Sequence, residues 1–174
     1  MVIVTDYYFF KGKMAKKIIG VFGAGNIFSE NKAWGAAERV GRLLARKGFA
    51  VLTGGLGGVM TAASKGAKEA GGTTVGILPG NRSTSPANRY VDIAIYTGMG
   101  EARNVINVKS CNAAIAIGGE YGTLSEIGLA LKGGCPIILL QSWSLAPHNS
   151  RMRSGWIVAE TVEQAVNLAV EAAG

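Results

Sequence analysis

The residues best suited to chemistry are the glycines of the turn at 118–122 and the hydroxyl and carboxyl groups of Thr123 and Glu126, which follow it. An apolar, β-branched run at 113–117 precedes the turn, is too short for a helix and predicts a buried strand. From Thr123 onward, apolar residues recur at helical spacing. A strand that feeds a helix through glycines leaves N–H groups free at the helix N-terminus, where the dipole favours an anion. The turn is therefore suited to binding a phosphate group.

Glu126 has two interpretations. The sequence Thr123-Leu124-Ser125-Glu126 matches a capping box, in which the threonine hydroxyl and the glutamate carboxylate accept hydrogen bonds from unpaired N–H groups. Glu126 would then be purely structural. The same spacing suits a carboxylate that faces a ligand, and the motif alone leaves both interpretations open.

Three further glycine turns follow predicted strands. The turn at 23–25 lacks the third glycine of a dinucleotide fingerprint, because Phe28 takes its place, so we do not expect an NAD site. The turn at 54–58 holds four glycines, which let the backbone approach a ligand closely. It lacks the Lys-Ser/Thr ending of a P-loop, so ATP hydrolysis is not supported. The last turn, 98–100, leads into a predicted helix.

Arg103 lies in the first turn of that helix. The helix dipole repels a positive charge there, and an external anion or a carboxylate would offset this repulsion. The alternative is an ordinary exposed arginine, because most surface charges contribute little.

Alternating strand and helix patterns must position these residues. Strands are predicted over 18–22, 49–53, 73–78, 91–96, 113–117, 135–140 and 156–159, the last at an edge. Helices are predicted from a cap at Ser29 or Asn31 to about residue 47, over 59–70, from 101 to near 110, from 123 onward and over 161–173. The alternation implies an α/β, Rossmann-like, doubly wound parallel sheet in three αβα layers. Ligands of such sheets bind outside the carboxyl ends of the strands, where all four glycine turns lie.

The 174 residues suit one globular domain with a sizeable core. We expect residues 18–174 to form a single Rossmann-like domain. Met14, directly before the first strand, looks like a natural start, so we expect residues 1–17 to be a disordered or non-native leader. The polar loop at 81–89 predicts a mobile flap.

Composition excludes several functional classes. No apolar run is long enough to cross a bilayer and no secretory signal is present, so we expect no membrane contact and a cytoplasmic location. Cys111 and Cys135 lack metal-ligand spacing and predict reduced core thiols, with no metal site. His148, a lone loop histidine, is given no catalytic role. The net charge of +7 suits a small anionic ligand, and no basic run interleaved with aromatic residues indicates nucleic-acid binding.

Four stretches of the chain resemble a known family. They are TGGLGGVM at 53–60, KGAKEAGGTTVGILPG at 65–80, TGMGEARNVIN at 97–107 and GTLSEIGLALK at 122–132. In order and spacing they are similar to the LONELY GUY superfamily, labelled "possible lysine decarboxylase", and within it to the molybdenum-cofactor carrier proteins. The phosphoribohydrolase branch carries PGGxGTxxE, whereas here Gly118 replaces the proline and Glu120 the second glycine. A carboxylate that pointed into a phosphate-binding turn would be repulsive, which argues against the hydrolase.

The resemblance implies a homodimer or homotetramer that binds a phosphorylated pterin or nucleotide and requires no resident cofactor, most closely a molybdenum-cofactor carrier. The ligand-binding residues that the turns and the resemblance indicate are Gly23, Gly25, Gly54, Gly55, Gly57, Gly58, Gly118, Gly119, Tyr121, Gly122 and Thr123. The alternative is a phosphoribohydrolase that cleaves the N-glycosidic bond of AMP or cytokinin nucleotides, with Arg103 and Glu126 as its catalytic residues. Lysine decarboxylation is not expected, because nothing supports a pyridoxal-phosphate lysine with its partners.

Overall fold

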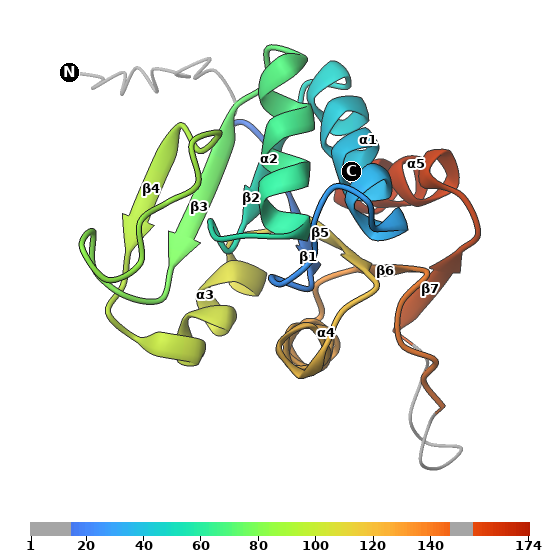
Figure 1. Cartoon of the computed structure of the whole chain (residues 1–174). Coiled ribbons are helices and arrows are strands. Elements are labelled where there is room, and N and C mark those ends of the chain that lie inside the picture. Colours follow the sequence, from blue (N-terminus) through green and yellow to red (C-terminus); the bar gives the residue numbers. More distant parts are fainter. Residues whose placement is uncertain (1–14, 147–154) are drawn as a thin grey trace, which may run out of the picture.

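The computed structural model describes residues 15–146 and 155–174, which form a parallel β-sheet flanked by helices (Figure 1). The strands are β1 (Ile18–Gly23), β2 (Ala50–Thr53), β3 (Thr74–Leu78), β4 (Ile93–Tyr96), β5 (Ala113–Ile117), β6 (Ile137–Leu140) and β7 (Trp156–Ala159). The helices are α1 (Lys32–Arg46), α2 (Val59–Glu69), α3 (Asn104–Lys109), α4 (Tyr121–Gly133) and α5 (Val162–Ala173), with a 3₁₀ turn, Gly100–Arg103, directly before α3. The predicted Rossmann-like, doubly wound α/β fold is confirmed.

The order of the strands in the sheet is β4-β3-β2-β1-β5-β6-β7, with β4 and β7 at the edges. The chain builds outward from β1 to β4 and then returns, so that β5 pairs with the free side of β1. Gly23, the last residue of β1, lies opposite Ile117, the last residue of β5. The topological switch point therefore lies between the carboxyl ends of these two strands.

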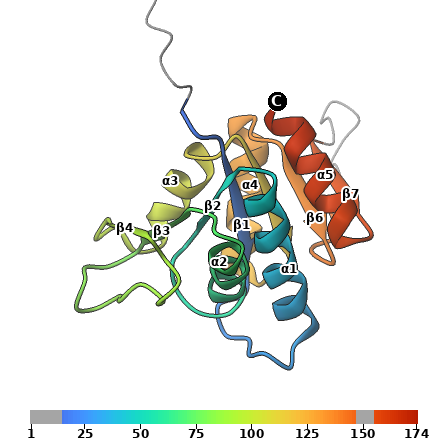
Figure 2. The same ribbon diagram turned by 90° about the horizontal axis from the view of Figure 1, so that it is seen from above.

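Helices cover both faces of the sheet. Views at right angles show α1, α2 and α5 on one face and α3 and α4 on the other (Figure 1 and Figure 2). The first face carries the larger core, in which Val40 of α1 and Val166 of α5 pack with Val21 of β1. On the second face, Val108 of α3 and Ile127 of α4 pack with other core residues of the sheet. Burial on both sides explains why the central strands are continuous apolar runs in the sequence.

The remaining expectations concern the leader, the lone histidine, the two cysteines, membrane-spanning helices and metal sites. Residues 1–14 of the expected leader and His148 lie outside the described residues. Cys111 and Cys135 are free thiols, and both are half-buried rather than fully in the core. Within residues 15–146 and 155–174, no helix is both long and apolar enough to span a membrane. The same residues contain no group of three or more His, Cys, Asp or Glu side chains that could hold a metal ion.

Candidate functional site

Three of the predicted glycine turns meet at the switch point. The N–H of Val59, at the start of α2, donates to the carbonyl oxygen of Ala24 over 3.0 Å, which joins the turn after β2 to the turn after β1. Gly57 allows this approach, because a β-carbon there would lie 2.7 Å from the carbonyl oxygen of Gly25. On Gly23 a β-carbon would lie 2.5 Å from the carbonyl oxygen of Ile117, where β5 ends. The turns at 23–25, 54–58 and 118–122 therefore lie together outside the carboxyl ends of β1, β2 and β5, the place where open α/β sheets bind ligands in a crevice.

Four of the predicted ligand-binding residues are buried, namely Gly54, Gly55, Gly58 and Thr123, and the contacts of Gly55 and Thr123 show what they do. The N–H of Gly55 already donates to the hydroxyl oxygen of Thr53 over 3.1 Å. The Thr123 side chain is 3% exposed and packs against Gly119, where a β-carbon would lie 2.5 Å from the threonine hydroxyl oxygen. These two residues shape the turns rather than present groups to solvent.

The N-terminus of α4 is free of a side-chain cap. The helix begins at Tyr121, two residues earlier than the sequence predicts, and Glu120 occupies the N-cap position without a side-chain hydrogen bond to the helix. The capping-box interpretation of Glu126 is therefore wrong: its carboxyl group is directed toward α3 and leaves the N–H groups of the first turn unpaired by side chains. Gly118 and Gly119 make the turn possible with φ angles of 55° and 107°, which favour glycine.

The N-terminus of α2 is similar. Its N-cap is Gly58, with φ of 58°, and no side chain of the described residues caps it, although the N–H of Val59 donates to the carbonyl oxygen of Ala24. At the start of α1, by contrast, the Asn31 side chain accepts a 2.9 Å hydrogen bond from the N–H of Ala33. The Thr161 hydroxyl likewise accepts a 3.2 Å bond from the N–H of Gln164 in α5. The N-termini of α2 and α4 thus lack a side-chain cap at the carboxyl ends of β2 and β5, where they favour negative charge.

Arg103 is a buried residue, so the interpretation as an ordinary exposed arginine is wrong. The residue is 8% exposed, and its guanidinium group lies against Gly54, where a β-carbon would be 2.6 Å from both terminal guanidinium nitrogens. Its Nη1 is 3.8 Å from Oε1 of Glu126, at the long end of the range for an ion pair. Its Nε has no hydrogen-bond partner within the described part of the chain. Burial lowers the pKa of Arg103, although Glu126 and Glu101 oppose this effect.

Glu126, the acidic partner of Arg103, is 6% exposed. Burial raises its pKa from 4.5 to about 7, although two neighbours favour the charged form. These are Asn107, whose Nδ2 donates to Oε1 of Glu126 over 2.8 Å, and the Arg103 guanidinium. A carboxyl group with this pKa holds or releases a proton near neutral pH.

The exposed side of the crevice is formed by the first residues of α4. Tyr121 is 82% exposed, and its ring centre lies 6.0 Å from that of Trp143, with the planes inclined by 39°. Glu120 is exposed beside it. The site therefore combines uncapped N–H groups, an accessible aromatic ring and one surface carboxylate.

Comparison with known proteins identifies the family. The profile of the SLOG cluster4 family matches residues 16–166. The chain belongs to the SLOG cluster4 family. An uncharacterised protein of Archaeoglobus fulgidus is 47% identical over 152 residues, which cover 87% of this chain and 93% of that protein.

Two solved structures are similar to this SLOG cluster4 protein over almost their whole length. The molybdenum cofactor binding protein of the phototrophic bacterium Rippkaea orientalis superposes with a TM-score of 0.81 at 41% identity, covering 91% of this chain and 98% of that one. The molybdenum cofactor carrier protein of Chlamydomonas reinhardtii gives a TM-score of 0.78 at 41% identity, over 90% and 98% of the two chains. The predicted resemblance to molybdenum-cofactor carriers is confirmed.

Two further residues of the candidate site were not predicted from the sequence. Asn107 is fully buried and holds Glu126, while Asn104, 7% exposed, donates from Nδ2 to the hydroxyl oxygen of Ser125 over 3.0 Å. Their signal was the spacing Arg103, Asn104, Asn107, which places three polar side chains on one helix face. Together with Glu126 they form a buried polar layer between α3 and α4.

Proposed function

We propose that this SLOG cluster4 protein is a carrier that binds the molybdenum cofactor, a phosphorylated pterin, as its cargo. The observation that carries the proposal is the pair of uncapped helix N-termini, those of α2 and α4, at the switch point of the sheet. Such an arrangement binds a phosphate group without a lysine or a metal ion. The 41% identity to a molybdenum cofactor binding protein and to a molybdenum cofactor carrier protein supports the choice of cargo.

The residues present fit a phosphorylated pterin. N–H groups of the first turn of α4, at Tyr121 and Gly122, are suited to donate to the phosphate, and the exposed Tyr121 ring offers a flat surface to the pterin. Stacking of a heterocycle on an aromatic side chain contributes about 1–3 kcal/mol. Arg103 adds positive charge from behind Gly54 without occupying the crevice.

Hydrolysis of a nucleoside 5′-monophosphate is the second candidate, and one observation favours it. The pKa of Glu126, raised to about 7, would let this carboxyl group act as a general base near neutral pH. Against this, both Glu126 and Arg103 are more than nine-tenths buried, so a substrate has little access to either. Binding without turnover agrees better with this burial.

We further propose that the carrier is a homo-oligomer of the cytoplasm that takes a small phosphorylated ligand and no nucleic acid. The free thiols Cys111 and Cys135 suit a reducing compartment. Residues 18–174 are proposed to form one domain.

A pair of aspartate substitutions on α4 tests the carrier proposal. Gly122→Asp places a carboxylate beside the uncapped N-terminus, whereas Gly128→Asp places the same group in the middle of the same helix. A β-carbon would meet no atom within 4 Å at either glycine, so both variants should fold. Gly122→Asp is expected to weaken binding of the molybdenum cofactor, measured by fluorescence titration, by about tenfold or more because of the opposed charges.

Gly128→Asp should bind the cofactor like the wild type. Equal binding by the wild type and both variants would contradict the proposed phosphate site. In parallel, the wild type and Glu126→Gln are incubated with AMP, and free adenine is followed by chromatography. Release of adenine by the wild type but not by Glu126→Gln, without cofactor binding, would show that the protein is a hydrolase and not a carrier.

A further inference from the structure

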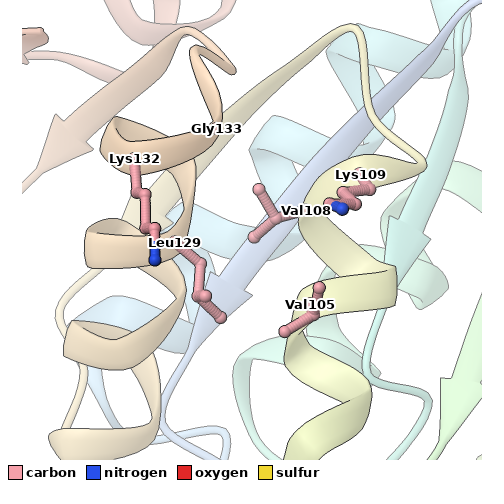
Figure 3. Close-up of a pocket in the computed structure, with 6 residues that line it drawn as sticks. All are labelled: Val105, Val108, Lys109, Leu129, Lys132 and Gly133. Atoms are coloured by element: carbon pink, nitrogen blue, oxygen red, sulfur yellow. The ribbon is translucent and has the colours of Figure 1, made fainter.

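Two hollows in the surface of the described residues differ in their chemistry. The groove between α3 and α4 encloses about 360 Å³, and valine and leucine side chains point into it, with Lys109 and Lys132 at its rim (Figure 3). Its lining offers aliphatic groups and no aromatic ring. The second hollow is formed in part by α1 and α2, on the opposite face of the sheet, and encloses about 530 Å³. A volume of this size suits a small organic ligand.

The second hollow, which we call the α1–α2 pocket, is lined by polar and aromatic side chains from three segments. Trp34 comes from the first turn of α1, Thr61 and Lys65 come from α2, and Arg89 and Tyr90 come from the segment between β3 and β4. No glycine of the four turns is among the residues that line the pocket. The pocket is therefore separate from the candidate phosphate site.

Hydrogen bonds hold the walls of the α1–α2 pocket against the glycine turn at 54–58. The hydroxyl group of Thr61 donates to the carbonyl oxygen of Leu56 over 2.7 Å, and Nδ2 of Asn88 donates to the same oxygen over 3.0 Å. Oδ1 of Asn88 accepts a 3.1 Å bond from the N–H of Tyr90. The chain's own bonds thus fix the shape of the pocket, which lowers the entropic cost of binding a ligand.

The pocket offers one cation without an acidic partner. Arg89 is exposed, the carbon of its guanidinium group lies 4.9 Å from the centre of the Tyr90 ring, and its Nη2 donates to the Tyr90 hydroxyl oxygen over 2.7 Å. No carboxylate in the described part of the chain pairs with Arg89. Lys65, by contrast, pairs with Glu38 over 2.9 Å and with Glu69 over 3.5 Å. Arg89 therefore keeps guanidinium N–H groups for an anion, and its fork of donors suits a phosphate.

Two aromatic rings line the pocket from different elements. Trp34 is half-buried and packs against the core beneath α1. Tyr90 is half-buried as well, and its carbonyl oxygen accepts a 2.6 Å hydrogen bond from the Thr74 hydroxyl at the start of β3. Both rings are thus anchored to the fold. Stacking of a nucleic-acid base on such a ring contributes about 1–3 kcal/mol.

We propose that the α1–α2 pocket is a second ligand site, which binds a purine nucleoside monophosphate. The two anchored rings, Trp34 and Tyr90, would contact the base, whose large flat face suits them, and Arg89 would bind the phosphate. The Tyr90 hydroxyl accepts its hydrogen bond from Arg89, so its proton remains available to an acceptor of the ligand. This site is separate from the glycine turns to which the proposed function assigns the cargo.

Calorimetric titration with GMP tests the two halves of the proposed ligand. Guanosine, which lacks the phosphate, and ribose 5-phosphate, which lacks the base, are the truncated probes. GMP is expected to bind once per chain at low salt. Each truncated probe should bind about tenfold more weakly or worse, because it loses either the contact with Arg89 or the contact with the rings.

Two arginines of the segment between β3 and β4 give a matched pair of variants. Arg89 lines the pocket, whereas Arg82 does not line it and lies 5.6 Å from the centre of the Tyr96 ring. Arg89→Ala is expected to raise the dissociation constant of GMP by about tenfold, because it removes a charged partner of the phosphate. Arg82→Ala should leave this constant within about twofold of the wild type.

Tryptophan fluorescence locates the bound ligand. GMP that stacks on Trp34 should quench its emission, and Trp34→Phe should lose this response. The variant should still bind GMP within about threefold of the wild type by calorimetry, because phenylalanine retains an aromatic ring. Trp143 and Trp156 do not line the pocket, so their emission should not change.

The two sites are distinguished by exchanging the variants. Gly122→Asp, which weakens binding of the cargo, should bind GMP like the wild type, and Arg89→Ala should bind the molybdenum cofactor like the wild type. Failure of the wild type to bind GMP would overturn the proposed pocket, as would GMP binding that Arg89→Ala leaves unchanged. GMP binding that Gly122→Asp weakens would also overturn it, because GMP would then lie at the glycine turns.

Titration of the wild type with the molybdenum cofactor separates this proposal from the proposed function. A protein that binds the cofactor but not GMP keeps the carrier function and loses the second site. A protein that binds GMP in the pocket but no cofactor keeps the second site and loses the carrier function.

Discussion

Replacing Glu126 with glutamine should make the protein more stable at alkaline pH. The pKa of Glu126 is about 7 in the folded chain, against an ordinary value of 4.5 in an unfolded one. Between these values the folded chain holds a proton that the unfolded chain has lost. The free energy of unfolding is therefore highest below the unfolded pKa and falls as the pH rises through the folded pKa, after which it levels off.

The structure sets the size of this effect. The interval between the two pKa values corresponds to about 3 kcal/mol, taken as an upper value for a carboxyl group 6% exposed. Glutamine has nearly the same shape as glutamic acid, keeps an oxygen that can accept the hydrogen bond from Asn107, and does not titrate. Glu126→Gln should therefore be more stable than the wild type by less than about 1 kcal/mol near pH 5, and by up to about 3 kcal/mol by about pH 8.

Urea unfolding of both proteins between about pH 5 and about pH 8, followed by circular dichroism, measures this difference. The expected result is a gap between the two free energies that opens as the pH rises. A gap that is the same at every pH would show that folding does not raise the pKa of Glu126. That outcome would refute the buried-acid description of the site and remove the physical basis for a general base.

Three further predictions concern other parts of the molecule. In Gly54→Ala the new β-carbon would lie 2.6 Å from the guanidinium nitrogens of Arg103 and 2.7 Å from the sulfur of Met60. Thermal unfolding should show a loss of about 1–3 kcal/mol, and an unchanged melting temperature would mean that Arg103 moves aside freely. Asn31→Ala removes the cap of α1 and should lower the free energy of unfolding by about 1 kcal/mol, and an unchanged stability would mean that this cap contributes little. Glu120→Gln removes the carboxylate beside the N-terminus of α4 and should tighten phosphate binding about twofold to fivefold at low salt. This gain should disappear at high salt. A gain that persists there would show that charge repulsion by Glu120 is not its cause.

Most of the fold could be predicted because its strands are buried on both sides. The residues of β5 are all buried, and the sequence shows them as an uninterrupted apolar run between polar and glycine-rich segments. The cap at Asn31 was also predictable, because it depends on residues that are adjacent in the chain. Sequence patterns predict local structure, and in these two segments the conformation that the local sequence favours is also the one that the tertiary fold requires.

The site was predicted less well because its chemistry depends on contacts between distant segments. Thr123 and Glu126 have the spacing of a capping box, but the glycine turn starts α4 earlier and directs the carboxyl group to Asn107 instead. Arg103 is buried because Gly54, on a different turn, leaves room for its guanidinium group. No periodicity in the sequence carries that information, since the two residues lie in turns that are distant along the chain.

The pairing of β1 with β5 also governs when the crevice can exist during synthesis. β1 ends at Gly23, but the other wall of the crevice requires β5 and the first turn of α4, at Ile117 and Tyr121. About two thirds of the chain must therefore leave the ribosome before a cargo can bind, and this long-range pairing forms slowly compared with local contacts. Under the carrier proposal, a truncated or half-folded chain cannot capture the cofactor. Cargo binding then occurs only in chains in which β1 and β5 have paired, and it stabilises those chains against unfolding.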